Sequence, residues 1–191
     1  MKKLRITYNA PVMLTFVLLC FAATLLGVLT GNMLTGLLFS VYRSSWANPL
    51  TYLRLFTHVL GHAGFEHFIG NATFLLLLGP MLEEKYGSRT MLKVILLTAG
   101  VTGLAHCLFW GNSSLCGASG VVFACILLSS FTEFREKEIP LSFILIAVLF
   151  IGQEIYKGIA IDDNISNLTH ILGGAVGGVY GYLLNRRKSK T

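Results

Sequence analysis

The sequence predicts an all-α, polytopic membrane protein in which six helices cross the bilayer as one bundle. Apolar residues make up 54% of the 191-residue chain and its mean hydropathy is +0.69, whereas charged residues make up only 13%. This share of charge is about half that of a soluble globular domain, which excludes a disordered chain and an ordinary cytosolic enzyme. The third observation is a series of long uncharged runs, which mark the expected spans.

The first uncharged run extends from Ile6 to Tyr42, and residues 11–31 of it can cross a hydrocarbon core of roughly 30 Å. The basic segment 1–5 before it resembles the start of a signal peptide. The apolar run is too long for the core of a signal peptide, and no clear small-x-small cleavage site follows it. A retained signal-anchor helix is therefore expected.

The second span is expected over residues 65–82, because the apolar run ends at the charged turn Glu83–Gly87. No formal charge then occurs between Lys93 and Glu133, a stretch too long for one helix. The turn-forming segment Trp110–Gly117 interrupts this stretch. It therefore divides into two further spans, at about 91–110 and 117–133.

The last two spans follow a charged loop. Residues 139–156 are expected to form the fifth span, with Pro140 in the first turn, where its missing N–H does no harm. Residues 167–185 are expected to form the sixth span.

The distribution of basic residues gives the orientation of these spans. Twelve of the fifteen Lys and Arg residues fall at the two termini and in the loops after the second and fourth spans, whereas the other loops hold Arg43, Arg54 and Lys157. By the positive-inside rule the larger group is cytoplasmic, so both termini lie inside and the number of spans is even. The net charge of +6 is thus a topological signal and does not indicate a nucleic-acid partner.

The segment from Asn32 to Glu66 is long for a loop in a compact protein and is rich in aromatic side chains. Such loops usually carry function or structure of their own, and the aromatic residues favour a position in the membrane interface. No internal repeat or linker is visible, so residues 1–191 are expected to form a single domain. The four cysteines are interpreted as packing residues, with a bridge between Cys107 and Cys116 left open.

Polar residues gather near the outer starts of the three spans that run inward. The second span carries His67 and Asn71, the fourth carries Ser119, and the sixth carries Asn167 and His170. Polar groups inside a membrane are costly and are functional candidates by default. Three helices therefore present polar groups at a similar depth, where they can meet.

Ser119 lies in the sequence Gly117-Ala-Ser-Gly120, at the expected junction of a loop and a helix. The small neighbours leave its hydroxyl unobstructed, and a helix start offers unpaired N–H groups that can stabilise an oxyanion. Small residues around a serine are also common packing material between membrane helices. The motif alone therefore leaves a nucleophile and a packing role both open.

His170 begins a stripe on the sixth span that continues with Gly173 and Gly177. A Gly-x-x-x-Gly pair lets a helix approach a neighbour closely, so a histidine on the same stripe faces that neighbour. If the neighbour is the fourth span, the imidazole can take the proton of Ser119 as a general base. A hydrogen bond to a backbone carbonyl is the alternative role.

A histidine-rich run leads into the second span, with His58, His62 and His67 followed by Asn71. Imidazoles four residues apart can chelate zinc, but no carboxylate or cysteine stands at convincing ligand spacing, and the pattern His-Glu-x-x-His is absent. No metal is therefore expected. His67 and Asn71 share a helix face and can instead donate N–H groups to an oxyanion.

In combination these motifs resemble the rhomboid intramembrane serine proteases, in particular their short bacterial form with six helices. The likeness covers nearly the whole chain. It rests on four features in the family's order: Arg54–Thr57 before the histidine run, the Glu83–Gly87 turn, Gly117–Gly120, and His170 with Gly173 and Gly177. The chain departs from many members at Leu53, where they have tryptophan, so the anchoring of the first long loop is expected to differ.

The resemblance implies a role for each motif. Ser119 would be the nucleophile and His170 the general base of a dyad without a carboxylate. His67, Asn71 and the backbone N–H of Ser119 would hold the oxyanion. Phe123 would take the place of a tyrosine packed on the catalytic histidine. Four small residues would support the site: Gly117, Gly120, Gly173 and Gly177.

The resemblance also implies the reaction and the setting. The protein would hydrolyse peptide bonds in or beside transmembrane segments of other proteins, without a cofactor. Its partners would be those substrates and the lipid bilayer, with no nucleic acid and with the oligomeric state left open. In a bacterial inner membrane the site would open to the outer side, with the loop at 157–166 as a lid and the fifth span moving aside to admit substrate.

Two other classes of protein remain as alternatives. A channel, transporter, scaffold or inactive relative would use the same polar groups to line a pore or to bind a partner. A metalloprotease would use the histidine run to bind zinc.

Overall fold

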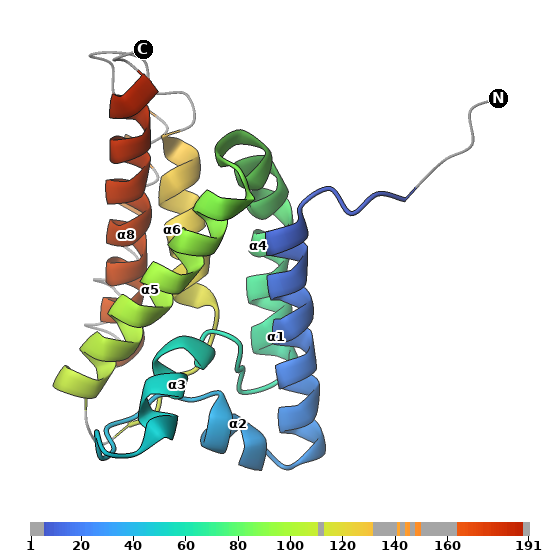
Figure 1. Cartoon of the computed structure of the whole chain (residues 1–191), viewed down its shortest axis with the longest axis vertical. Helices are drawn as coiled ribbons and strands as arrows, with labels where there is room; N and C mark the ends of the chain where they lie inside the picture. Colours follow the sequence, from blue (N-terminus) through green and yellow to red (C-terminus); the bar gives the residue numbers. More distant parts are fainter. Residues whose placement is uncertain are drawn as a thin grey trace.

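The chain is described here from a computed structural model at residues 6–110, 113–131, 141, 144–145, 148–149 and 164–188, with the side chains of the last segment described at 169–184. Every named element in these ranges is a helix (Figure 1), which confirms the predicted all-α class for the described residues. The helices are α1 (Pro11–Leu29), α2 (Met33–Leu38), α3 (Pro49–Thr57), α4 (Phe65–Tyr86), α5 (Ser88–Phe109), α6 (Ser119–Ser130) and α8 (Asn164–Lys188).

Three of the described helices, α1, α4 and α5, are long and apolar enough to cross a bilayer. They correspond to the first three predicted spans. The predicted spans at 117–133 and 167–185 correspond to α6 and α8. The fifth predicted span, apart from five isolated positions, and most of the loop at 157–166 lie outside the described residues. The number of six spans therefore stays a prediction.

The C-terminal end of α4 and the N-terminal end of α5 extend beyond the ends predicted from hydropathy. α4 continues through the exposed Glu84 and Lys85 to Tyr86, and α5 begins at Ser88. Hydropathy marks where the apolar run stops, whereas a helix continues for as long as its backbone hydrogen bonds do. The break comes at Gly87, whose φ of +83° lies in a region that glycine adopts readily.

Glu83 joins the end of α4 to the beginning of α1. Its buried carboxylate accepts the N–H of Val12 at 3.0 Å and that of Met13 at 2.9 Å. Pro11 occupies the first helical position, where no donor is needed. A carboxylate at a helix N-terminus satisfies free donors and complements the helix dipole. The start of the first predicted span is therefore held by an acid 70 residues away in the sequence.

The predicted long loop carries structure of its own, as expected, because it contains α2 and α3. Both lie at the end of the bundle where α1 finishes (Figure 1). The buried Arg54 of α3 donates its Nε–H to the Leu37 carbonyl at 2.8 Å, and its guanidinium lies 4.5 Å from the centre of the Tyr42 ring. The Thr57 hydroxyl donates to the Leu38 carbonyl. These contacts make the loop a folded cap.

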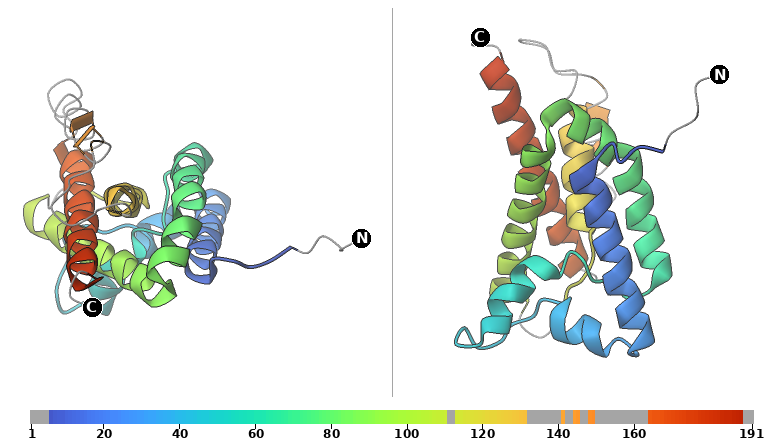
Figure 2. Two further views of the ribbon diagram at one scale, coloured as in Figure 1. Left: turned by 90° about the horizontal axis from the view of Figure 1, so that it is seen from above. Right: turned by 45° about the vertical axis from the view of Figure 1, so that its right-hand side comes forward.

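The helix α6 lies at the centre of the described bundle. Figure 2 shows it between α4 and α8, and α8 is its most extensive packing partner. Most of its side chains are buried, which suits a helix that is apolar on all sides. All four cysteines lie in the described part of the chain and are free thiols, so the bridge left open between Cys107 and Cys116 is not formed. Because Ser119 is the first residue of α6, it lies at one end of the most enclosed helix.

Candidate active site

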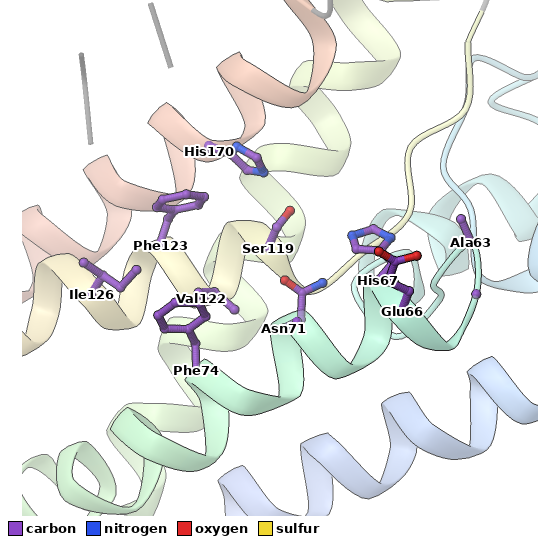
Figure 3. A pocket seen from close by; sticks show the side chains of 12 residues that line it. Ala63, Glu66, His67, Asn71, Phe74, Ser119, Val122, Phe123, Ile126 and His170 are labelled. Atoms are coloured by element: carbon purple, nitrogen blue, oxygen red, sulfur yellow. The ribbon is translucent and has the colours of Figure 1, made fainter. Parts of the chain in front are cut away.

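A cavity of about 780 Å³ lies between α4, α6 and α8, and residues of all three helices line it (Figure 3). The structure thus brings Ser119, His170, His67 and Asn71 to one cavity, although they are far apart in the sequence. Asn167 lies in the first turns of α8, but its side chain is outside the described residues. The full lining is Ala63, Gly64, Glu66, His67, Gly70, Asn71, Phe74, Ser119, Val122, Phe123, Ile126 and His170.

Gly117 determines where the helix that carries Ser119 begins. Its φ of +138° is open to glycine and strained for other residues. An added Cβ at this position would also come within 2.9 Å of Cε1 of His67. The helix therefore starts at Ser119, two residues later than the predicted span, and the serine is free of the regular hydrogen bonds of a helix interior.

The segment before Ser119 is held in place by the first long loop. Val41 and Leu115 exchange backbone hydrogen bonds of 2.9 Å as an isolated antiparallel bridge. The Gly117 N–H donates to the His58 carbonyl at 3.0 Å, and the Ala118 N–H donates to Nε2 of His62 at 3.4 Å. Four contacts thus fix the approach to the serine from a part of the chain more than 50 residues earlier in sequence.

His170 lies on α8 beside Ser119. Its side chain is buried, and its imidazole lies 4.5 Å, centre to centre, from the ring of Phe123 at an angle of 42°. Figure 3 shows the Ser119 hydroxyl turned toward the His170 ring. Phe123 comes one turn after Ser119 on α6, so the same helix supplies the hydroxyl and the ring that packs on the imidazole.

Small residues bring α8 into backbone contact with α6. A Cβ added at Gly173 would collide with the Gly120 carbonyl, and one added at Gly177 would collide with the Ala124 carbonyl. α6 is therefore the neighbour that the glycine stripe of α8 meets. His170 is three residues from Gly173 on this stripe, which explains why its imidazole reaches the start of α6.

Asn71 and His67 face the cavity from α4. The Asn71 side chain is 8% exposed, and its Nδ2 is buried without a hydrogen-bond partner among the described residues. Figure 3 shows Asn71 rising from α4 toward Ser119. A buried amide without a partner is costly, so a free donor that lines a cavity is available to a ligand. His67 lies one turn earlier on the same face, at the end of the cavity near Ala63.

His58 and His62 are used for structure. Nε2 of His58 lies 3.2 Å from the Thr102 hydroxyl, and Nδ1 of His62 lies 3.1 Å from the Leu60 carbonyl. Burial lowers the pKa of both to about 4, and the neighbouring His67 contributes to the shift at His62. Both rings are therefore neutral at pH 7. No cluster of three His, Cys, Asp or Glu side chains that could hold a metal occurs among the described residues.

The apolar lining was not predicted from the sequence. Val122, Phe123 and Ile126 follow Ser119 at three, four and seven residues, the spacing of one helix face, and Phe74 follows Asn71 at three. This helical spacing is visible in the sequence and could have identified the side chains that share a face with Ser119 and Asn71. Of these four residues only Phe123 was identified, through the family resemblance.

The sequence matches the model of a known protein family. The sequence model described as "Rhomboid domain" matches residues 49–187, which include every residue of the cavity lining. The chain belongs to the rhomboid family. Its family and its long apolar helices identify it as an integral membrane protein.

Several curated rhomboids are similar in sequence. Rhomboid protease GluP of Bacillus subtilis is 31% identical over 132 residues, covering 66% of this chain and 25% of GluP. Rhomboid-related protein 2 of Mus musculus is 31% identical over 156 residues, covering 71% of this chain and 51% of the relative. Rhomboid protease GlpG of Yersinia pestis is 26% identical over 192 residues, covering 95% of this chain and 65% of GlpG. The chain thus spans between a quarter and two thirds of the length of these relatives.

Proposed function

We propose that this rhomboid is an intramembrane serine endopeptidase that cleaves transmembrane proteins with a dyad of Ser119 and His170. The observation that carries the proposal is the meeting of three groups in one cavity: the hydroxyl at the start of α6, the imidazole of α8 toward which it points, and the free amide donor of Asn71. Two of the relatives are named as proteases, which supports the same reading.

In the first half of the reaction, Ser119 Oγ attacks the carbonyl carbon of the scissile peptide bond and gives its proton to His170. The carbonyl oxygen becomes an oxyanion, which accepts hydrogen bonds from Asn71 Nδ2, the His67 imidazole and the Ser119 backbone N–H. His170 then passes the proton to the departing amine as the C–N bond breaks, which leaves an acyl-enzyme.

In the second half, water attacks the acyl-enzyme. His170 takes a proton from this water, and the new carbon–oxygen bond forms as Ser119 Oγ leaves and recovers a proton from the imidazolium. The products are a free carboxylate and the unchanged enzyme. The proton that Ser119 gives up leaves with the amine, and a proton from the attacking water replaces it on Ser119, so His170 alone suffices as the acid and base.

The dyad works without a carboxylate. Among the described residues that line the cavity, the single acid is Glu66, which lies at the end near His67 and not beside His170. Packing on Phe123 supplies the orientation that an acid gives the histidine in a triad. Gly117, Gly120, Gly173 and Gly177 support the site by allowing the turn before Ser119 and the close approach of α8.

The substrates proposed are transmembrane segments that unwind near the cut, because a peptide bond inside an intact helix is shielded by its own hydrogen bonds. The setting proposed is a bacterial inner membrane, with both termini in the cytoplasm and the cavity open to the outer side. Lateral access past the fifth span and a lid at 157–166 belong to the same proposal, with residues 1–191 acting as one domain.

A serine-directed fluorophosphonate tests the dyad without any knowledge of the substrate. The probe should label the native protein at Ser119 alone, and the label should be absent in Ser119→Ala and much slower in His170→Ala. Ser129, on the same helix, is the internal control for general serine reactivity. Labelling that persists in Ser119→Ala, or no labelling of the folded native protein, would contradict the assignment of Ser119 as the nucleophile of the dyad. In a separate assay with a transmembrane substrate, loss of cleavage on addition of a chelator would favour the metalloprotease class.

A further inference from the structure

We propose that Glu66 forms a subsite that selects substrates with a lysine or arginine close to the scissile bond. This inference rests on the proposed function and adds a substrate class to it. Glu66 lies in the first turn of α4, one residue before His67, and lines the same cavity as Ser119. Its side chain is exposed, so a bound chain can reach its carboxylate.

Glu66 gives one end of the cavity a negative charge. The described lining contains no lysine or arginine. Ala63 and His67 lie at the same end, whereas Phe123 and Ile126 lie at the other (Figure 3). The cavity is therefore apolar at one end and anionic at the other. This asymmetry favours one orientation of a bound peptide whose side chains differ in charge.

Neither of the two basic residues in the first long loop neutralises the Glu66 carboxylate. Arg43 donates to the carbonyls of Cys107 and Leu108 at 3.0 and 2.6 Å, and Arg54 is buried against Leu37 and Tyr42. Both basic residues of the first long loop are therefore occupied elsewhere. Within the described residues, Glu66 makes no ion pair.

The charge of Glu66 also bears on the reaction. A carboxylate next to the oxyanion donor His67 repels negative charge that develops in the transition state. A substrate cation that binds Glu66 removes this repulsion and adds an ion pair. A neutral substrate residue at the same place leaves the repulsion in force. Glu66 thus favours a basic substrate twice, through binding and through the transition state.

The size of the cavity limits where the basic residue stands. A volume of about 780 Å³ corresponds to roughly 9 Å across, the length of about three residues of extended chain. The lysine or arginine is therefore expected within about three residues of the cut.

A helix with an acid in its first turn gains stability from its dipole, and this is the ordinary role that a test must separate from selection. Glu66→Gln keeps the shape and removes the charge, and Glu66→Lys reverses the charge. Glu84→Gln is the matched control, because it removes an exposed acid from the opposite end of the same helix.

The experiment measures kcat/KM in liposomes for one transmembrane substrate carrying Lys, Gln or Glu at each position within three residues of the cut. The native protein should prefer Lys over Gln at one position or two adjacent positions by about threefold to tenfold. Added salt should reduce this preference. In Glu66→Gln the preference should vanish, and cleavage of the Gln substrate should rise. In Glu66→Lys the Glu substrate should become the preferred one, whereas Glu84→Gln should behave as the native protein.

Two results would overturn the inference: an absence of charge preference in the native protein at every position, or a Lys preference that survives unchanged in Glu66→Gln. Either one leaves the proposed function intact as long as Ser119→Ala is inactive toward all substrates. Cleavage by Ser119→Ala would instead contradict the proposed function itself.

Discussion

The backbone of Gly173 lies directly against the carbonyl of Gly120, so that α8 and α6 touch without intervening side chains. This contact sets the distance between the helix that carries His170 and the helix that begins at Ser119. The two side chains can meet only while it is preserved.

Gly173→Ala is therefore expected to destabilise the protein by ~1–3 kcal/mol, because the added methyl group overlaps a backbone atom that cannot move aside freely. Activity should fall as well, since α8 is pushed away from Ser119. Gly178→Ala on the same helix is the control, because its nearest neighbour is a ring carbon of Phe131 at 3.9 Å. Unfolding midpoints in detergent check the prediction, and equal midpoints for the two variants would contradict it.

Glu83→Gln is expected to destabilise the protein by ~1–3 kcal/mol, because the amide keeps one acceptor and turns an N–H toward a backbone donor of α1. The neighbouring Glu84 is exposed and belongs to the same helical turn, so Glu84→Gln should be nearly neutral. Comparison of the two unfolding free energies is the measurement. A Glu83→Gln variant as stable as Glu84→Gln would show that the contact to Val12 and Met13 contributes little.

Mild acid is expected to destabilise the fold through His58 and His62. The pKa of each is about 4 in the folded protein against 6.5 for an ordinary histidine, so the unfolded chain binds more protons between these values. Stability should be complete above pH 6.5, fall as the pH drops toward 4, and level off below it. The slope should reach at most about 1.4 kcal/mol per pH unit for each histidine.

Denaturant unfolding at pH 7.5, 6.0 and 5.0 measures this slope. His62→Gln should show a shallower dependence than the native protein, since one of the two buried rings no longer titrates. A stability that does not change between pH 7.5 and 5.0 would mean that these rings are not neutral and enclosed as described.

Asn71→Ala is expected to lower kcat by about 100-fold to 1,000-fold with little change in KM, because the lost donor serves the oxyanion and not the bound substrate. Stability should hold or rise, since a buried donor without a described partner contributes no hydrogen bond to the fold. Kinetics and an unfolding curve on the same preparation test both parts. A large loss of stability would indicate a structural amide.

The sequence predicted the position of the first helix well because α1 is a simple apolar run with proline at its start. It placed the end of α4 and the start of α5 less well, since hydropathy does not detect that a helix continues through the charged residues Glu84 and Lys85. The start of α6 depends on the backbone angle of Gly117, which spacing alone does not reveal.

Polar residues in spans were the strongest guide to the site, because their cost in a membrane makes each one conspicuous. The roles of His58 and His62 could not be predicted in the same way. Their partners, Thr102 and the Ala118 N–H, lie far along the chain, so a local pattern contains no trace of these contacts. The ligand spacing in the sequence argued against a metal site, but it did not reveal that these two histidines hold the segment before Ser119 and the helix α5.

Cleavage of a transmembrane substrate in liposomes by the native protein, Ser119→Ala and His170→Ala tests the central claim most directly. The native protein should release a fragment cut within or beside the transmembrane segment. Each variant should lose activity by about 1,000-fold or more while keeping the native unfolding midpoint. A folded variant that still cleaves near the native rate would contradict the dyad of Ser119 and His170.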